Sequence, residues 1–309
     1  MALEGVMRPG HAQIRVLELD KATHFYGEVL GLLETGRDAQ GRVYYKCWDE
    51  RDHNSIVLRE ADSAGIDFLG FKVRDEATLD AFEHKLQAAG IATSVMPAGD
   101  MLETGRRVRF TLPSGHVIEL YATKTCVGNG MSMTNPPPWY AESERGIAPV
   151  RFDHTLLYGP NIAAVKQIFC DILGFYLVER VLGPDNETEV AIWLSCGQKV
   201  HDVAFVENPE PGKLHHCSFL LESWEKVMRA GDIMSMNAVP VDIGPTRHGV
   251  TRGGTIYAWD PSGNRFETFQ GGYYPYPDYD TLTWTWEGFP QGLDYPQRKL
   301  HETFLTVYT

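Results

Sequence analysis

The chain has 309 residues, enough for two domains of ordinary size, and its 28 Lys and Arg residues against 41 Asp and Glu residues give a net charge of −13. That charge argues against nucleic acid and anionic membrane surfaces as partners, because both attract clustered cations. No apolar run approaches the roughly 20 residues of a membrane helix, and the start has no signal-peptide pattern, so we expect a cytoplasmic globular protein.

Apolar residues recur at helical spacing four times along the chain. In chain order the stripes are Phe25, Val29 and Leu32; Leu79, Phe82 and Leu86; Val165, Ile168 and Ile172; and a shorter pattern over residues 223–230. Apolar, β-rich segments follow these helices, for example residues 55–58 and 203–206. The pattern predicts a mixed α and β protein of four βαβββ units, two in each half, with strands outnumbering helices.

The second half of the chain repeats the first. Residues 8–14 correspond to residues 151–157, which lie 143 positions further on. The Pro113-Ser114-Gly115 turn corresponds to Pro261-Ser262-Gly263 at an offset of 148, so the second copy contains an insertion of five residues. Two halves built on one template account for both matches.

Proline-rich sequence separates the two copies. Residues 126–150 contain three consecutive prolines, which continue neither a helix nor a central strand, so we predict a linker there. We expect an N-terminal half over residues 1–145 and a C-terminal half over residues 146–309. The tail from Gly272 to Thr309 carries ten aromatic residues among prolines, too apolar for a solvated tail, and we expect it to pack over the second half.

The histidines and one glutamate of the second half predict a metal site. His154 lies on the first strand of that half, the pair His215-His216 follows in its second unit, and Glu267 lies near its last strand. Two imidazoles and one carboxylate form the facial triad of non-heme Fe(II) sites, in which three coordination positions stay open. Alternation along a strand indicates that one histidine of the pair points inward, but not which one.

The first half provides an internal comparison. His11 and Glu119 occupy the places of His154 and Glu267, but Phe68 stands where His216 lies in the second copy. Two ligands and a phenylalanine hold a divalent ion poorly. We therefore predict one metal ion per chain, bound in the second half.

Two hairpin turns set the register around each glutamate. A three-residue loop that ends at Gly263, in the positive-φ conformation, pairs Tyr257 with Glu267 across the ladder. The same construction in the first half places Arg109 opposite Glu119. We predict that Arg109 and Glu119 form an ion pair that fills the incomplete site.

Together these residues resemble a known family. The run Thr246-Arg247-His248, followed by residues 256–263 and Glu267, resembles the signature of extradiol ring-cleaving dioxygenases of the vicinal oxygen chelate superfamily. The resemblance covers nearly the whole chain and includes residues 199–202 and 214–216. It implies an α+β fold of four βαβββ modules paired into two similar halves, and a homotetramer.

The resemblance also implies the activity and the residues that support it. It implies Fe(II), with Mn(II) as the alternative, bound by His154, His216 and Glu267, because the family uses the second histidine of such a pair. It implies meta cleavage of catechol or an alkylcatechol by O2, giving 2-hydroxymuconate semialdehyde, with His201, His248 and Tyr257 around the substrate. His201 is the candidate for accepting and returning a proton, since histidine titrates near neutrality. His248 and Tyr257 would hydrogen-bond the substrate oxygens.

Three alternatives remain open at this point. The first is an extradiol dioxygenase for a bicyclic diol such as 2,3-dihydroxybiphenyl, since sequence does not determine pocket volume. The second is a metal-free binding protein on the same fold, for which a triad in one half has no use. The third is lyase or isomerase chemistry of the glyoxalase type, which usually has a second carboxylate where this chain has His154.

Overall fold

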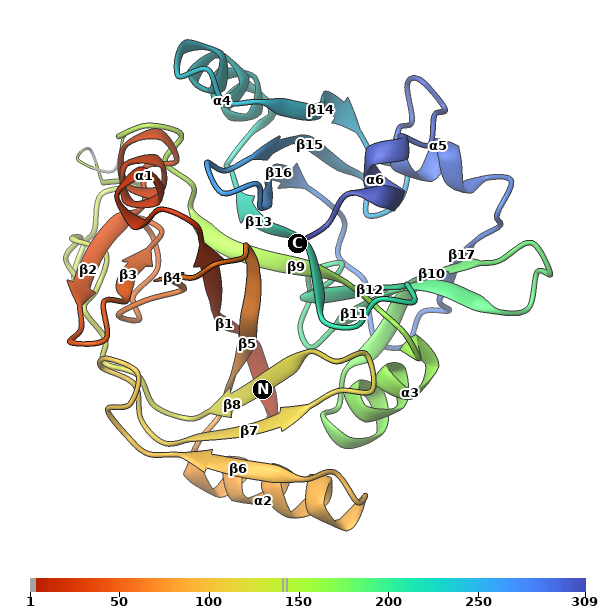
Figure 1. Ribbon diagram of the computed structural model, residues 1–309, viewed down its shortest axis with the longest axis horizontal. Coiled ribbons are helices and arrows are strands. Elements are labelled where there is room, and N and C mark those ends of the chain that lie inside the picture. The colour runs from red at the N-terminus through yellow and green to blue at the C-terminus, as the bar shows by residue number, and fades with distance from the viewer. Residues whose placement is uncertain (1–3, 141, 143) are drawn as a thin grey trace.

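Four units of the order strand, helix, three strands follow one another along the chain, as the sequence predicts (Figure 1). The computed structural model describes residues 4–140, 142 and 144–309. The strands form two mixed sheets, one in each half of the chain. None of the described helices has the length and apolar character that crossing a membrane requires.

The first sheet has eight strands in the order β2-β3-β4-β1-β5-β8-β7-β6. Its first unit comprises β1 (Val6–Val16), α1 (Leu19–His24) with a π-helical turn (Phe25–Val29), β2 (Leu33–Arg37), β3 (Val43–Lys46) and β4 (Ile56–Glu60). Its second unit comprises β5 (Gly65–Val73), α2 (Glu76–Ala88), β6 (Thr93–Met96), β7 (Arg107–Thr111) and β8 (Val117–Tyr121). The two units meet where β1 pairs antiparallel with β5.

The second sheet has nine strands in the order β14-β15-β16-β13-β9-β12-β11-β10-β17. Its first unit comprises β9 (Arg151–Gly159), α3 (Ile162–Gln167) with a π-helical turn (Ile168–Ile172), β10 (Tyr176–Leu182), β11 (Glu189–Ser195) and β12 (Val203–Glu207). Its second unit comprises β13 (Lys213–Leu220), α4 (Trp224–Met236), β14 (Val241–Arg247), β15 (Gly253–Trp259) and β16 (Arg265–Gly271). Strands β9 and β13 meet antiparallel, as β1 and β5 do.

Equivalent helices in the two halves begin in the same way. The carboxylate of Asp75 accepts the backbone N–H of Thr78 at 2.8 Å and caps α2. Ser223, which lies 148 positions further on, caps α4 through the N–H of Lys226 at 3.3 Å. Such caps satisfy backbone donors that the first helical turn leaves free. Figure 1 shows these two helices at opposite ends of the molecule, beside β6 and β14.

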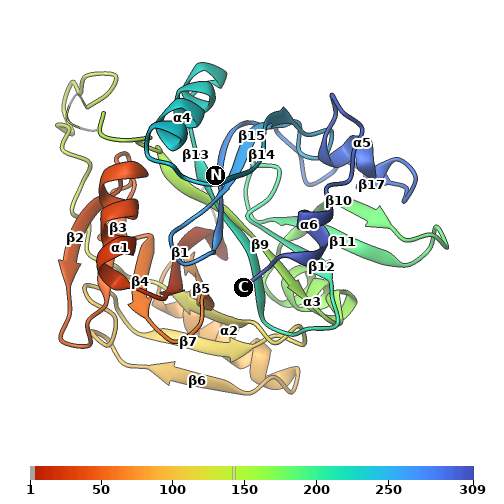
Figure 2. The same ribbon diagram turned by 45° about the horizontal axis from the view of Figure 1, so that its top comes forward.

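The tail packs over the second half, as predicted. Its strand β17 (Leu282–Trp284) extends the second sheet by pairing parallel with β10. The short helices α5 (Phe289–Leu293) and α6 (Glu302–Thr306) lie between the β14 end and the β10–β17 end of this sheet (Figures 1 and 2). Phe289 and Phe304 of the tail are buried in this packing, whereas Tyr274, Tyr276 and Tyr279 stay exposed.

Buried contacts join the two halves. Phe71 of the first sheet packs edge-on against Phe169 and Phe175 of the second half, with ring centroids 5.9 and 5.4 Å apart. The phenol of Tyr26 donates a hydrogen bond of 3.0 Å to a carboxylate oxygen of Asp260, at the base of the turn that contains Gly263. Gly263 has a φ of +86°, the positive value that the predicted turn requires.

We expect Tyr26→Phe to lower the free energy of unfolding by about 1 kcal/mol, because the substitution removes one hydrogen bond from the buried carboxylate of Asp260. Urea denaturation followed by tryptophan fluorescence measures the effect. Tyr279→Phe, at an exposed tyrosine of the tail, is the control and should leave stability unchanged. Equal stability of Tyr26→Phe and the wild-type protein would contradict this role for the inter-half hydrogen bond.

Candidate metal centre

Three buried side chains from neighbouring strands bring their ligand atoms together in the second half. His154 comes from β9, His216 from β13 and Glu267 from β16, and one atom of each lies within 4.8 Å of the others. Glu267 Oε2 lies 3.0 Å from His154 Nε2 and 3.6 Å from His216 Nε2. Among the described residues this is the one group of at least three His, Cys, Asp or Glu side chains with such an arrangement.

The free atoms of this group fit a metal ion. Neither His216 Nε2 nor Glu267 Oε2 has a hydrogen-bond partner among the described residues, although both are buried. His154 Nδ1 lies 2.9 Å from Asp153 Oδ2, and this carboxylate orients the ring with Nε2 toward the group. Thr255 donates to Glu267 Oε1 at 2.6 Å and orients the carboxylate. Two nitrogen donors and one oxygen donor are a set that Fe(II) and Mn(II) both accept.

The electrostatics of the group keep the carboxylate ionised. Burial alone would raise the pKa of Glu267, but His154, whose Nε2 lies 3.0 Å away, and the other adjacent imidazoles lower the pKa well below its usual range. Burial lowers the pKa of His216 well below its ordinary value. Burial also acts to lower the pKa of His154, but the adjacent carboxylates of Asp153 and Glu267 outweigh it and raise the pKa.

The other three predicted site residues line the same cavity. His201, His248 and Tyr257 join the three ligand candidates around one cavity. The ring of His201 lies 3.9 Å from that of His154, centroid to centroid. Tyr257 pairs with Glu267 across the β15–β16 ladder, as the turn geometry predicts.

Hydrogen bonds fix the proton positions on His248. Its Nδ1 bonds to the carbonyl oxygen of Leu293, which only accepts, so Nδ1 carries the proton. Burial lowers the pKa of His248, so the ring is neutral near pH 7. Its Nε2 then accepts a hydrogen bond from the Tyr257 phenol at 2.7 Å. Burial, together with the nearby charge of Glu267, raises the pKa of Tyr257 well above its ordinary value. The phenol is therefore a proton donor at the cavity wall.

His215 lies beside the cavity and outside the group of ligand atoms. A register irregularity between Leu214 and His216 interrupts the pairing of β13 with β9, so the two histidines do not follow simple alternation. The ring of His215 stacks on Tyr158 at 4.8 Å and meets Phe304 edge-on at 4.6 Å. This packing directs the ring toward the C-terminal tail.

Several residues of the site were not predicted from the sequence. Asp153, Thr255 and Phe304 support or line the cavity. Asp153 precedes His154 directly, and Thr255 lies on the same strand face as Tyr257, so adjacency and alternation were usable signals. Phe304 had no such signal, because α6 meets the site only through tertiary packing.

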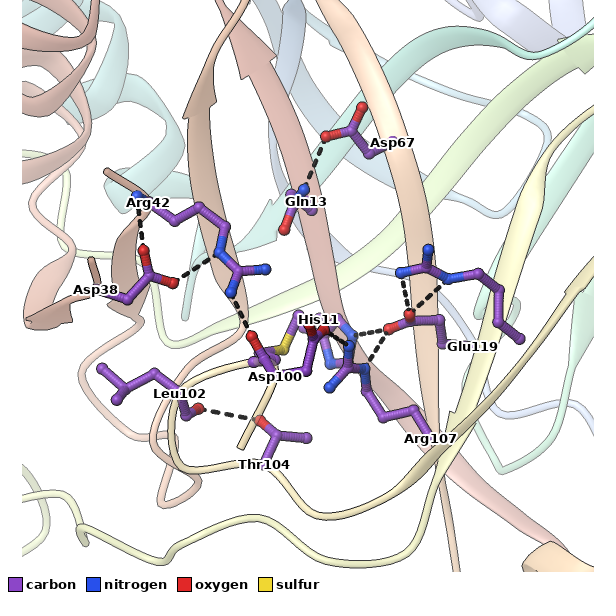
Figure 3. A network of polar contacts seen from close by, with 12 residues as sticks. His11, Gln13, Asp38, Arg42, Asp67, Asp100, Leu102, Thr104, Arg107 and Glu119 are labelled. Carbon is purple, nitrogen blue, oxygen red and sulfur yellow. Dashed lines mark hydrogen bonds and ion pairs between the residues drawn. The ribbon is translucent and has the colours of Figure 1, made fainter. Parts of the chain in front are cut away.

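In the corresponding place of the first half, guanidinium groups pair with the buried glutamate, and Figure 3 shows Arg107 and His11 beside Glu119. Arg109 pairs with Glu119 Oε1 at 2.5 and 2.9 Å, which confirms the predicted ion pair. Arg107 also pairs with Glu119, through Oε2 at 2.9 Å, and with Asp100 at 2.6 Å. Phe68 lies beneath Arg109, whose guanidinium carbon is 4.8 Å from the ring centroid.

These neighbours hold the first-half glutamate ionised without a metal. Burial alone would raise the pKa of Glu119, but the hydrogen bond to His11 and the charges of Arg107 and Arg109 lower it to about 2. Burial, together with the charge of Lys124, lowers the pKa of His11 to about 3, so that ring is neutral near pH 7. The guanidinium groups therefore supply the positive charge.

Family models match both halves of the chain. Residues 66–125 match the catechol 2,3-dioxygenase-like N-terminal domain, and residues 151–268 match the glyoxalase/bleomycin resistance protein/dioxygenase superfamily. The chain is 51% identical over 307 residues to metapyrocatechase of Pseudomonas sp. (strain CF600), with 99% of each chain covered. It is 28% identical to the manganese-dependent 2,3-dihydroxybiphenyl 1,2-dioxygenase of Geobacillus genomosp. 3, covering 92% of this chain and 91% of that one.

Solved structures agree with these matches. The 2,3-dioxygenase LapB from Pseudomonas sp. KL28 superposes with a TM-score of 0.91 at 72% identity, over 92% of this chain and 99% of that one. Homoprotocatechuate 2,3-dioxygenase from Brevibacterium fuscum superposes with a TM-score of 0.87 at 25% identity, over 100% and 95% of the chains. Fold and site thus define an extradiol ring-cleaving dioxygenase of the vicinal oxygen chelate superfamily. Within that class, the chain belongs to the metapyrocatechase family.

We expect Glu119→Gln to destabilise the protein by about 3 kcal/mol at pH 7, because buried Arg107 loses one of its two carboxylates. The pKa of Glu119 is lowered from 4.5 to about 2 in the folded protein. Its contribution to stability is therefore complete above about pH 4.5 and is lost as the pH falls through about 2.

Denaturant unfolding between pH 7 and pH 3 should thus show the wild type and Glu119→Gln converging below pH 4.5. Glu187→Gln, at an exposed loop position, is the control and should match the wild type throughout. A constant difference between Glu119→Gln and wild type over this range would contradict the assignment.

Proposed function

We propose that this protein is a catechol 2,3-dioxygenase that cleaves catechol or an alkylcatechol with O2 to give 2-hydroxymuconate semialdehyde. The observation that carries the proposal is the convergence of His154, His216 and Glu267 beside a cavity that also contains His201 and Tyr257. The 51% identity to metapyrocatechase over the full chain supports the same reaction.

We propose Fe(II) as the metal, held by His154, His216 and Glu267. Bound iron would offer open positions to both catechol oxygens and to O2, and would pass electron density between two reactants that react slowly in solution. Mn(II) is the second candidate, because the same donor set accepts it and one relative is named as manganese-dependent. Restoring activity to the metal-free protein with each ion separately, without oxygen during loading, distinguishes the two.

In this proposal, His248 and Tyr257 orient the substrate oxygens. The Tyr257 phenol lies 2.7 Å from His248 Nε2 and stays protonated, and its single proton can turn from His248 to a deprotonated catechol oxygen. The carbonyl of Leu293 fixes the other side of the His248 ring, so the pair keeps one orientation. Four apolar residues also line the cavity: Leu156, Trp193, Val250 and Phe269. They would exclude water from the flat faces of a bound catechol ring.

His201 is the proposed acid–base residue. Burial and the neighbouring charges of His154 and Lys199 lower its pKa well below the ordinary value, so its imidazole is neutral. A neutral ring has the lone pair that a proton acceptor needs, and a lowered pKa favours return of the proton. His201 lies on the wall between the ligand cavity and a larger, more open cavity, and it lines both together with Phe269. A proton taken from the substrate therefore has a route toward solvent.

Substrate size separates this proposal from its closest alternative. Relatives named for the biphenyl diol are 24–28% identical to the chain, whereas the relative named metapyrocatechase in Pseudomonas is 51% identical. The test compares kcat/KM for catechol, the methylcatechols and 2,3-dihydroxybiphenyl, with the yellow ring-fission product as the signal. A higher kcat/KM for the biphenyl diol than for any monocyclic catechol would overturn the substrate assignment.

We also propose that the protein works in the cytoplasm and forms a homotetramer. Exposed aromatic side chains of the tail, including Tyr274, Tyr276 and Tyr279, offer apolar surface that a second copy of the chain could cover. Sedimentation equilibrium of the iron-loaded protein tests the oligomeric state. A monomer at micromolar concentration would contradict the tetramer.

Glu267→Gln should abolish stable iron binding, because it replaces the only carboxylate among the proposed ligands with a neutral amide. We expect metal analysis of protein purified without oxygen to find one iron per wild-type chain and less than about a tenth of that in the variant. Glu119→Gln alters the corresponding glutamate of the first half and should retain the iron. Loss of iron in Glu119→Gln and its retention in Glu267→Gln would reverse the assignment of the two halves.

His201→Phe should retain iron yet lower kcat for catechol by about 100-fold or more, the contribution typical of general acid–base catalysis. Steady-state assays with matched iron content measure the change. His53→Phe, at the position of the first half that corresponds to His201, is the control and should keep wild-type kcat. Unchanged kcat in His201→Phe would remove this residue from the mechanism.

A further inference from the structure

A short loop between β14 and β15 forms one wall of the ligand cavity. It contributes His248, Val250 and Thr251 to the cavity lining. Thr251 and Arg252, two consecutive residues with side chains, have φ values of +60° and +58°. This left-handed conformation is unfavourable for such residues and persists only where the surroundings impose it.

Glu179 supplies part of that restraint from a different unit of the fold. It lies on β10, is 1% exposed, and has three donors around its carboxylate. Its Oε1 accepts the backbone N–H of Thr251 at 2.8 Å and the phenol of Tyr273 at 2.9 Å, and its Oε2 accepts the indole N–H of Trp284 at 2.7 Å. A carboxylate fits these partners because all three bonds require an acceptor.

Trp284 transmits the same restraint to the start of the loop. Its ring packs so closely that a Cβ at Gly249 would lie 2.7 Å from it, and Gly292 meets the same ring. The carbonyl of Gly292 accepts the backbone N–H groups of Gly249 and Val250 at 2.8 and 3.0 Å. At the other end, the guanidinium of Arg252 lies over the Tyr273 ring at 4.4 Å. Both ends of the loop therefore depend on side chains that Glu179 holds.

We propose that Glu179 is a positioning residue for substrate binding, which keeps the 248–252 loop in the one conformation that completes the cavity wall. The inference rests on the proposed function. Glu179 touches neither the substrate cavity nor the three ligand candidates, and it acts through Thr251, Trp284 and Tyr273. Without this carboxylate, Thr251 and Arg252 leave the left-handed conformation in a fraction of the molecules, and in those molecules the cavity wall is incomplete.

Glu179→Gln tests the proposal with little change in volume. In either orientation of the amide its NH2 group faces a donor N–H, from Trp284 or from Thr251, so at least one hydrogen bond is lost. If the loop adopts the conformation that completes the cavity wall only about a tenth of the time, the apparent affinity of the protein for catechol falls about tenfold. We therefore expect KM for catechol to rise about tenfold, while kcat at saturation changes by less than about threefold because bound catechol restores the loop.

A loss of correctly folded protein would instead lower kcat and leave KM unchanged. The matched control is Glu189→Gln on the adjacent strand β11, whose carboxylate pairs with Lys166 and Arg180 and not with the loop. Its KM should equal that of the wild type. An unchanged KM in Glu179→Gln, or an equal rise in both variants, overturns the proposal.

Limited trypsin digestion gives a readout that does not depend on turnover. Arg252 is exposed, and the bond to Gly253 should be cleaved faster in Glu179→Gln than in the wild type or Glu189→Gln. If Glu179→Gln does not fold, Tyr273→Phe decides the question: a raised KM at unchanged kcat supports the proposal, and an unchanged KM overturns it. Failure of the wild-type protein to cleave catechol would overturn the proposed function, while the trypsin comparison still tests the loop restraint.

Discussion

A buried glutamate at the same register position of each sheet is the constraint on which the molecule depends. Glu119 and Glu267 are each at most 1% exposed, and an ionised carboxylate in such surroundings requires a nearby positive charge. The first half provides it with two guanidinium groups. In the second half the equivalent neighbours are Thr255 and Tyr257, which carry no positive charge, so the adjacent His154 imidazole and the metal ion proposed above would balance the carboxylate instead.

The repeat explains why much of this could be predicted from the sequence. The two halves have the same hairpin register at an offset of 148. One turn geometry therefore predicted two pairings, that of Arg109 with Glu119 and that of Tyr257 with Glu267. Helices α2, α3 and α4, and strands β4 and β12, also lie where the apolar patterns predict them, because each element buries one face against its neighbours. The stripe of Phe25, Val29 and Leu32 instead falls on the π-helical turn after α1 and beyond it. The two π-helical turns were not predicted, since a single extra residue per turn leaves little trace in apolar spacing.

What the sequence did not reveal depends on contacts between distant segments. Arg107 precedes Arg109 by two residues and shares its strand face, yet its pairing with both Glu119 and Asp100 requires a loop whose path was unknown. The inward direction of His216 depends on an irregularity in β13 that alternation does not predict. Glu179 meets Trp284 because β17 returns to pair with β10, and it meets Thr251 and Tyr273 from other segments that also follow long after its own unit is complete.

The first half has Arg107 at the position where the second half has Thr255, and this difference accounts for the different chemistry of the two halves. A guanidinium both hydrogen-bonds to the glutamate and neutralises its charge. Because the guanidinium belongs to the chain, no small molecule or ion can replace it. A threonine hydroxyl makes the orienting hydrogen bond at 2.6 Å but leaves the negative charge in place. The same scaffold therefore forms a closed ionic cluster in the first half, where guanidinium groups of the chain pair with the glutamate. In the second half it leaves a buried carboxylate beside two imidazoles, the donor set that the proposed metal ion would bind.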